Sequence, residues 1–161
     1  MTTHSRKVLP PWFTSEGIDL SLCPIDNVLR QALSADDQQF RTGCTLLKSM
    51  CCSGRTEAGV FLLGLLQRHP DDYGRLLIIA DALSAFPCQE TVELFASELR
   101  RVKGSSSTRA YLRRLIEALE QFPIALTEAT VRRLAVDTLV GPRFRQRLGA
   151  LADRHDYYDD A

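Results

Sequence analysis

The chain has 161 residues, of which 45% are hydrophobic and 25% charged. This length corresponds to about one domain, and the composition excludes a wholly disordered chain, a collagen-like chain and a bare membrane span. The 20 basic and 20 acidic residues cancel, which argues against bulk packaging of nucleic acid, but residues 97–156 carry 12 basic and only 7 acidic residues.

Residues 1–17 are expected to form an N-terminal arm. The pair Pro10–Pro11 disfavours a regular element there, and Gly17 breaks the segment again. Trp12 and Phe13 are large apolar residues in this polar stretch. We expect them to pack on the first helices, and a docking motif for a partner is the alternative.

Helical periodicity dominates the rest of the chain. In the first half we expect helices over about residues 24–33, 36–52, 56–68 and 71–86. The last two are apolar on nearly every side, which is typical of helices at the centre of a molecule.

The second half continues in the same way. We expect helices over about residues 90–103, from the Gly104–Ser107 loop to Phe122, from a cap at Thr127 to about Leu139, and after Gly141 to residue 156. No segment shows a strand-like alternation, and residues 157–161 are expected to be an acidic tail. The sequence therefore predicts an all-α fold with one helical-repeat domain over residues 18–156.

A repeat with an offset of 36 residues supports this prediction. The segment Ala82–Pro87 aligns with Ala118–Pro123, and upstream Leu76 aligns with Leu112. Each block follows another helix, so the repeating unit is a two-helix hairpin. Because one hairpin cannot bury its own apolar face, we expect seven or eight helices stacked as antiparallel hairpins in an α–α superhelix.

The Ala-Leu-x-x-Phe block that ends each second helix resembles the end of a HEAT-type repeat. Residues 131–139 resemble the Val-Arg-x-x-Ala…Leu portion of such repeats, and the resemblance covers roughly residues 55–139. It departs at Leu76 and Leu112, where these repeats often carry Arg. The resemblance implies an α-solenoid that serves as a binding scaffold, and it transfers no catalytic residue.

No motif for catalysis is present: there is no HExxH, no glycine-rich phosphate loop and no GxSxG. The acids at 36–37 and 71–72 suit the dipoles of helix first turns. Asp81 is expected on a solvent-facing stripe that Glu117 repeats, with a buried functional carboxylate as the alternative. We predict no catalytic residue, no metal and no cofactor; an enzyme or accessory factor without a recognisable motif is the second alternative function.

Basic residues of the second half are the main candidates for binding. Equivalent positions stack in a solenoid, so these side chains are candidates for a ridge over residues 100–147 that meets phosphates or an acidic protein surface. A plain solvated face is the alternative, because cations near helix C-termini are favourable on their own. The predicted partner-binding residues are Arg100, Arg101, Lys103, Arg109, Arg113, Arg114, Arg132 and Arg133, together with Trp12 and Phe13.

Five cysteines lack zinc-site spacing, and we expect them to be reduced, mostly buried small side chains. The basic N-terminus has no apolar segment typical of a secretory signal, and the longest apolar run has seven residues, whereas a membrane span needs about 20. We therefore expect a cytoplasmic protein.

The predicted function is a non-enzymatic protein-interaction module, an adaptor or scaffold that holds a partner in its concave face. Nucleic-acid binding through the arginine ridge is the first alternative. A homo-oligomer is also compatible with the sequence, since an open solenoid end with apolar residues can pair with itself.

Overall fold

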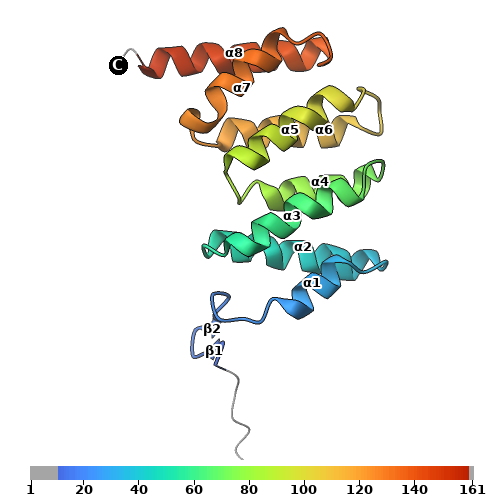
Figure 1. The fold of residues 1–161 in the computed structure, drawn as a ribbon, viewed down its shortest axis with the longest axis vertical. Coiled ribbons are helices and arrows are strands. Elements are labelled where there is room, and N and C mark those ends of the chain that lie inside the picture. The colour runs from blue at the N-terminus through green and yellow to red at the C-terminus, as the bar shows by residue number, and fades with distance from the viewer. Residues whose placement is uncertain (1–10, 160–161) are drawn as a thin grey trace, which may run out of the picture.

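Eight helices and one short ribbon make up the described chain in a computed structural model, which covers residues 11–159 and the side chains of residues 11–154 (Figure 1). The helices are α1 (Asp26–Ala32), α2 (Asp37–Cys52), α3 (Thr56–Arg68), α4 (Tyr73–Leu83), α5 (Gln89–Arg101), α6 (Arg109–Gln121), α7 (Ile124–Val136) and α8 (Pro142–Asp159). The predicted all-α fold is confirmed. No helix in this part of the chain is long and apolar enough to cross a membrane.

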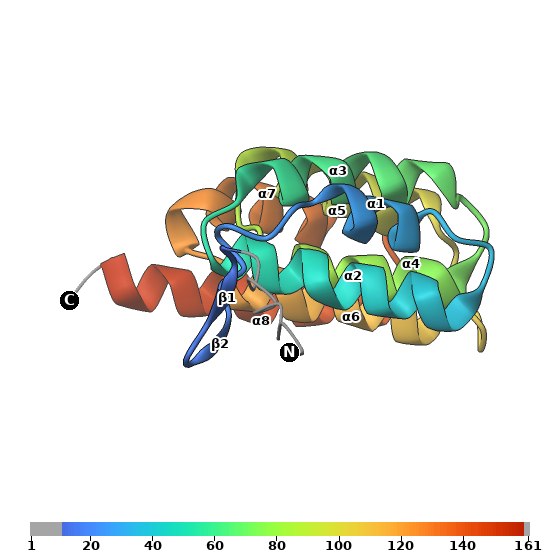
Figure 2. The same cartoon turned by 90° about the horizontal axis from the view of Figure 1, so that it is seen from below.

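Consecutive helices pair as antiparallel hairpins, and the hairpins stack in chain order from α1–α2 to α7–α8 (Figure 1). Figure 2 looks along the stack and shows two layers. The helices α1, α3, α5 and α7 form what we call the first-helix layer, and α2, α4, α6 and α8 form the second-helix layer. Each interior hairpin therefore has a neighbour on both sides, as the stacked-repeat prediction requires.

The 36-residue spacing extends through all four second helices. The sequence shows it between α4 and α6, and the structure adds the same buried position in α2 and α8: Phe40, Leu76, Leu112 and Leu148. The next buried turn repeats it with Cys44, Ala80, Ile116 and Ala152. All of these side chains belong to one apolar core, which runs through every hairpin.

Acidic caps begin two of these helices. Asp36 accepts a hydrogen bond from the backbone N–H of Gln39 (2.8 Å), and Asp72 accepts one from that of Arg75 (3.0 Å). A side-chain oxygen at this position satisfies one of the free N–H groups of the first turn. One acid of each pair in the sequence is thus explained by helix capping.

Several predicted boundaries differ from the structure: α4 ends at Leu83 instead of about Phe86, and α7 ends at Val136 instead of about Leu139. Thr127 does not cap a helix: it lies buried inside α7, which begins directly after Pro123. Proline lacks an N–H, which a helix start does not need, so this residue is favourable there and the helix needs no later cap. The helix α8 extends through Asp159, so residues 157–159 of the predicted tail are helical, and residues 160–161 lie outside the described chain.

The arm also differs from the prediction, because its residues from 11 onward contain a small ribbon. Strands β1 (Phe13–Thr14) and β2 (Gly17–Ile18) pair antiparallel, with Phe13 opposite Ile18. Gly17 has a φ of +129°, which allows the tight reversal. Two-residue strands are too short to show an alternating pattern in the sequence. Phe13 is 46% exposed and does not join the core, contrary to the packing that we expected.

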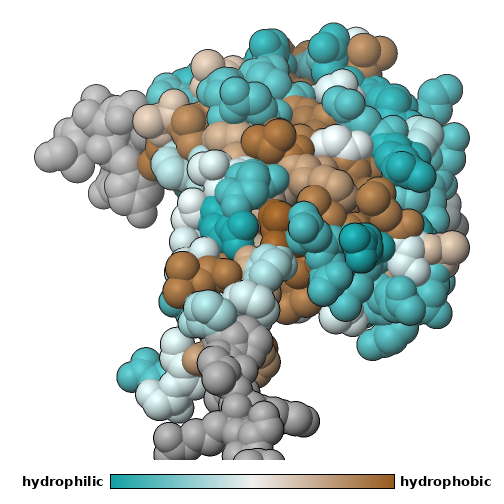
Figure 3. Space-filling model, turned by 60° about the horizontal axis from the view of Figure 1, so that its bottom comes forward, coloured by the Kyte–Doolittle hydropathy of each residue, from teal (hydrophilic) through white to brown (hydrophobic). Residues whose placement is uncertain are grey.

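Apolar side chains remain exposed toward the N-terminal end of the stack. Val60 on α3 is 62% exposed, and Leu33, which follows α1, is 46% exposed. Figure 3, in which this end is turned toward the viewer, shows brown surface among hydrophilic side chains. The helix α1 has 7 residues against 13 in α3, so the first hairpin contains the shortest helix of the described chain.

Candidate binding site

The basic residues predicted as one ridge lie in both layers of the stack. Those of the first-helix layer are Arg100 and Arg101 in α5 and Arg132 and Arg133 in α7, with Lys103 just after α5. Those of the second-helix layer are Arg109, Arg113 and Arg114 in α6. The structure therefore does not place them on one continuous ridge. Phe13 begins β1 and Trp12 directly precedes it, and the ribbon of β1 and β2 lies at the N-terminal end of the stack, away from α7 and α8 (Figure 1).

Carboxylates neutralise the predicted binding arginines of the first-helix layer. The ion pairs on this surface are Arg100–Asp137 (2.8 Å), Arg132–Glu128 (3.0 Å) and Arg133–Glu93 (2.9 Å). Partly exposed pairs of this kind add little to stability. Their effect on binding is larger, since each one cancels a charge that an anionic partner would otherwise meet.

Arg101 belongs to a largely buried network. It donates to both carboxylate oxygens of Glu98, at 2.8 and 2.7 Å, and to the carbonyl of Pro70 at 2.8 Å. The hydroxyl of Tyr111 donates to the same carboxylate at 2.8 Å. Burial, followed by the charge of Glu98, raises the pKa of Tyr111, so this phenol stays a neutral donor. Glu98 therefore ties α5 to α6 through Tyr111, and Arg101 ties α5 to the turn before α4.

Arg114 is also engaged within the fold. Its guanidinium lies 2.8 Å from Asp81 and donates to the hydroxyl of Ser84 at 2.9 Å. Asp81 accepts a further hydrogen bond from Lys48 at 2.8 Å. The carboxylate of Asp81 therefore connects α2, α4 and α6, instead of facing only solvent as the sequence predicts.

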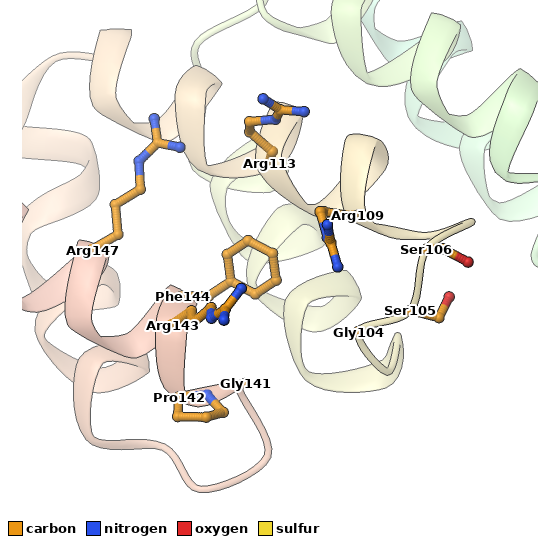
Figure 4. Close-up of a pocket in the computed structure, with 10 residues that line it drawn as sticks. All are labelled: Gly104, Ser105, Ser106, Arg109, Arg113, Gly141, Pro142, Arg143, Phe144 and Arg147. Atoms are coloured by element: carbon orange, nitrogen blue, oxygen red, sulfur yellow. The ribbon is translucent and has the colours of Figure 1, made fainter.

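The other two predicted arginines of this layer, Arg109 and Arg113, line a pocket of about 600 Å³ between α6 and α8 (Figure 4). We call it the arginine pocket. Its lining residues are Gly104, Ser105, Ser106, Arg109, Arg113, Gly141, Pro142, Arg143, Phe144 and Arg147. In Figure 4 the arginine side chains surround the Phe144 ring, coming from both helices.

The positive charge of the arginine pocket is only partly balanced. Arg147 donates to both oxygens of Glu120, at 2.8 and 2.7 Å. The side chains of Arg109, Arg113 and Arg143 make no hydrogen bond or ion pair with any described residue, and none of the residues lining the pocket is acidic. Three guanidinium groups therefore face one cavity without an internal counter-charge.

Local sequence explains how the pocket forms. Thr108 accepts a hydrogen bond from the N–H of Ser105 and donates one to the carbonyl of Lys103, both at 2.8 Å, which holds the loop against the start of α6. Arg109 and Arg113 are four residues apart and share a helix face, as do Arg143 and Arg147 in α8. Like charges at this spacing disfavour a helix, so the stability of the separate helices does not explain these two pairs.

Only some residues of the arginine pocket were predicted from the sequence as partner-binding residues. Arg143 and Arg147 fall within the predicted ridge but not among the predicted partner-binding residues. The matching four-residue spacing of the two arginine pairs is the signal that could have connected them. Their closeness depends on how α6 and α8 stack, which no local pattern shows.

Other features of the described chain are weaker candidates for a binding or catalytic site. A hollow of about 330 Å³ between α2 and α4 contains Lys48, Asp81 and Arg114, whose charges pair with one another. No group of three or more His, Cys, Asp or Glu side chains within the described part of the chain could hold a metal ion. Burial raises the pKa of the Cys44 thiol to about 12 and that of the Cys51 thiol to about 11, so neither is an activated nucleophile.

The fold and the pocket together define a class of protein: an all-α stack of antiparallel helical hairpins with a basic pocket near its C-terminal end. Searches of protein-family models, curated proteins and solved structures find no match to this chain.

Proposed function

We propose that the chain is a non-enzymatic protein-interaction module of the HEAT-like helical-repeat type, and that the arginine pocket holds an acidic segment of a partner protein. The observation that carries this proposal is the unbalanced charge of Arg109, Arg113 and Arg143 in one cavity. Guanidinium groups bind oxyanions through paired hydrogen bonds, and a rigid stack of hairpins holds them in place without the ligand.

The distribution of charge favours a protein partner over a nucleic acid. Nucleic-acid binding needs a track of cations along the backbone, and single strands also need exposed aromatic platforms. In the first-helix layer Arg100 and Arg133 are already paired with carboxylates, and Phe144 is the one aromatic residue lining the pocket. An isolated pocket suits a compact anionic group better than a long polyanion.

The cysteines support a cytoplasmic location for this module. All five, which lie within the described residues, are free, and Cys44 and Cys51 are buried without a disulfide partner. Thiols of this kind are typical of a reducing compartment.

Affinity co-purification from the organism's own cells tests the proposal. The bait is the full chain, compared with a triple variant in which Arg109, Arg113 and Arg143 are each replaced by Gln. A control variant carries Arg→Gln at 30, 41 and 68, which are exposed arginines elsewhere, so its net charge is the same. We expect mass spectrometry to identify a discrete partner that the wild type and the control retain equally.

The pocket variant should retain that partner about tenfold less, because charge-assisted hydrogen bonds are lost. Equal retention by the pocket variant and the control would contradict the proposed site. Loss of all partners on nuclease treatment would support the nucleic-acid alternative instead.

A further inference from the structure

We infer that the arginine pocket recognises a phosphorylated side chain of the partner, in preference to a carboxylate. This inference rests on the proposed function, because it names the anionic group that enters the same pocket. It follows from the charge, the donor arrangement and the size of the cavity.

The charge of the cavity exceeds what one carboxylate can balance. Arg109, Arg113 and Arg143 contribute three unpaired positive charges, and the pocket lining includes no acid. An Asp or Glu side chain supplies one negative charge, whereas a phosphorylated Ser or Thr supplies about 1.5 to 2 at neutral pH. A phosphoryl group therefore matches the pocket more closely.

The directions of the donors lead to the same choice. Arg109 and Arg113 project from α6, and Arg143 comes from the start of α8 on the other side of the cavity (Figure 4). A carboxylate is planar and has two oxygens, and one guanidinium can bind both of them. A phosphoryl group is tetrahedral and has three terminal oxygens, so guanidinium groups from two helices can each reach a different edge.

Neutral groups of the pocket complete the fit. The hydroxyl of Ser106 makes no hydrogen bond to another described residue and is available as a donor. The ring of Phe144 supplies an apolar surface beside the charged groups. A volume of about 600 Å³ exceeds that of a phosphoryl group alone, so the adjoining residues of a peptide can enter with it.

Three immobilised peptide libraries test the inference. Each has random flanking residues around a fixed centre, which is phosphoserine in the first, glutamate in the second and serine in the third. The full-length wild type should be retained at least about tenfold more by the phosphoserine library than by the glutamate library. The Arg→Gln variant at 109, 113 and 143 should lose this preference, and the control variant at 30, 41 and 68 should keep it.

Circular dichroism of the three proteins establishes that the variants are folded. Equal retention on the phosphoserine and glutamate libraries would overturn the inference while leaving the acidic-partner proposal in place, and so would retention on no library. Stronger retention on a single-stranded oligonucleotide column than on phosphopeptides, lost in the same variant, would overturn it in favour of nucleic acid. If the co-purified partner fails to depend on the pocket, the proposed function fails whatever the libraries show.

Discussion

Asp81 shows how one residue can join several hairpins. Its side chain is 49% exposed, and it lies 2.8 Å from both Lys48 and Arg114. Partial burial works to raise the pKa of Asp81, but the hydrogen bonds and charges of Lys48 and Arg114 outweigh it and hold the pKa below its ordinary value of 3.8. The ionised form is therefore the one that the fold stabilises.

This shift predicts a pH dependence for the substitution Asp81→Asn. The pKa is lower in the folded state than in the unfolded state, so ionised Asp81 adds stability above pH 3.8 and loses it as the pH falls through the folded value. At pH 7 the variant should be less stable by up to about 1 kcal/mol, since the ion pairs are half exposed. The difference should disappear in acid, as urea unfolding at several pH values can measure.

Asp153 offers a matched control, since it occupies the equivalent position in α8, 72 residues further on, and is exposed. Asp153→Asn should not lower the stability at either pH. If Asp81→Asn were as stable as the wild type at pH 7, or equally destabilised in acid, the bridging role of Asp81 would be wrong.

At the scale of single elements, close helix contacts depend on particular glycines. Gly43 in α2 faces α1, and a Cβ placed there would lie 2.8 Å from the Cα of Ala32 and 2.9 Å from the carbonyl carbon of Gln31. These are backbone atoms, so they can move only if the whole of α1 moves. Gly64 in α3 is different, because a Cβ there would meet nothing within 4 Å.

We therefore expect opposite effects from two identical substitutions. Gly43→Ala should destabilise the protein by about 1–3 kcal/mol, because the added methyl group overpacks the α1–α2 contact. Gly64→Ala should raise stability by up to about 1 kcal/mol, because alanine is the better helix former. Urea unfolding followed by circular dichroism measures both, and a stable Gly43→Ala variant would show that α1 does not pack so closely.

At this scale the sequence predicted much of the fold. The predicted helix at residues 56–68 coincides with α3, because its apolar residues and its end at His69–Pro70 are local signals. The start of α7 was missed because Pro123 can end one helix and begin the next, and the choice depends on packing. Gly43 and Gly64 cannot be told apart from the sequence, since each lies within a helix.

Across the whole molecule, stability should be highest in the middle of the stack. The helices α4, α5 and α6 belong to hairpins with neighbours on both sides, whereas α1 is seven residues long and lies at one end (Figure 1). In a stack, each hairpin is stabilised chiefly by its neighbours, so end hairpins open more readily than interior ones.

Hydrogen exchange followed by mass spectrometry tests this expectation. Backbone amides of α4 to α6 should exchange most slowly, and those of α1 should exchange fastest among the eight helices of the described chain. Uniform protection would show that the stack opens only as a unit. Slower exchange in α1 than in α4 would contradict the expectation that end hairpins open more readily than interior ones.

The sequence by itself determined the all-α class, the hairpin unit and its 36-residue spacing, because periodicity, proline and capping act between residues close along the chain. Only the tertiary structure decided which arginines are neutralised. Arg113 and Arg114 are adjacent in sequence, yet Arg114 pairs with Asp81 of another hairpin while Arg113 faces the arginine pocket. Ion pairs depend on distances between helices, and stacking alone sets those distances.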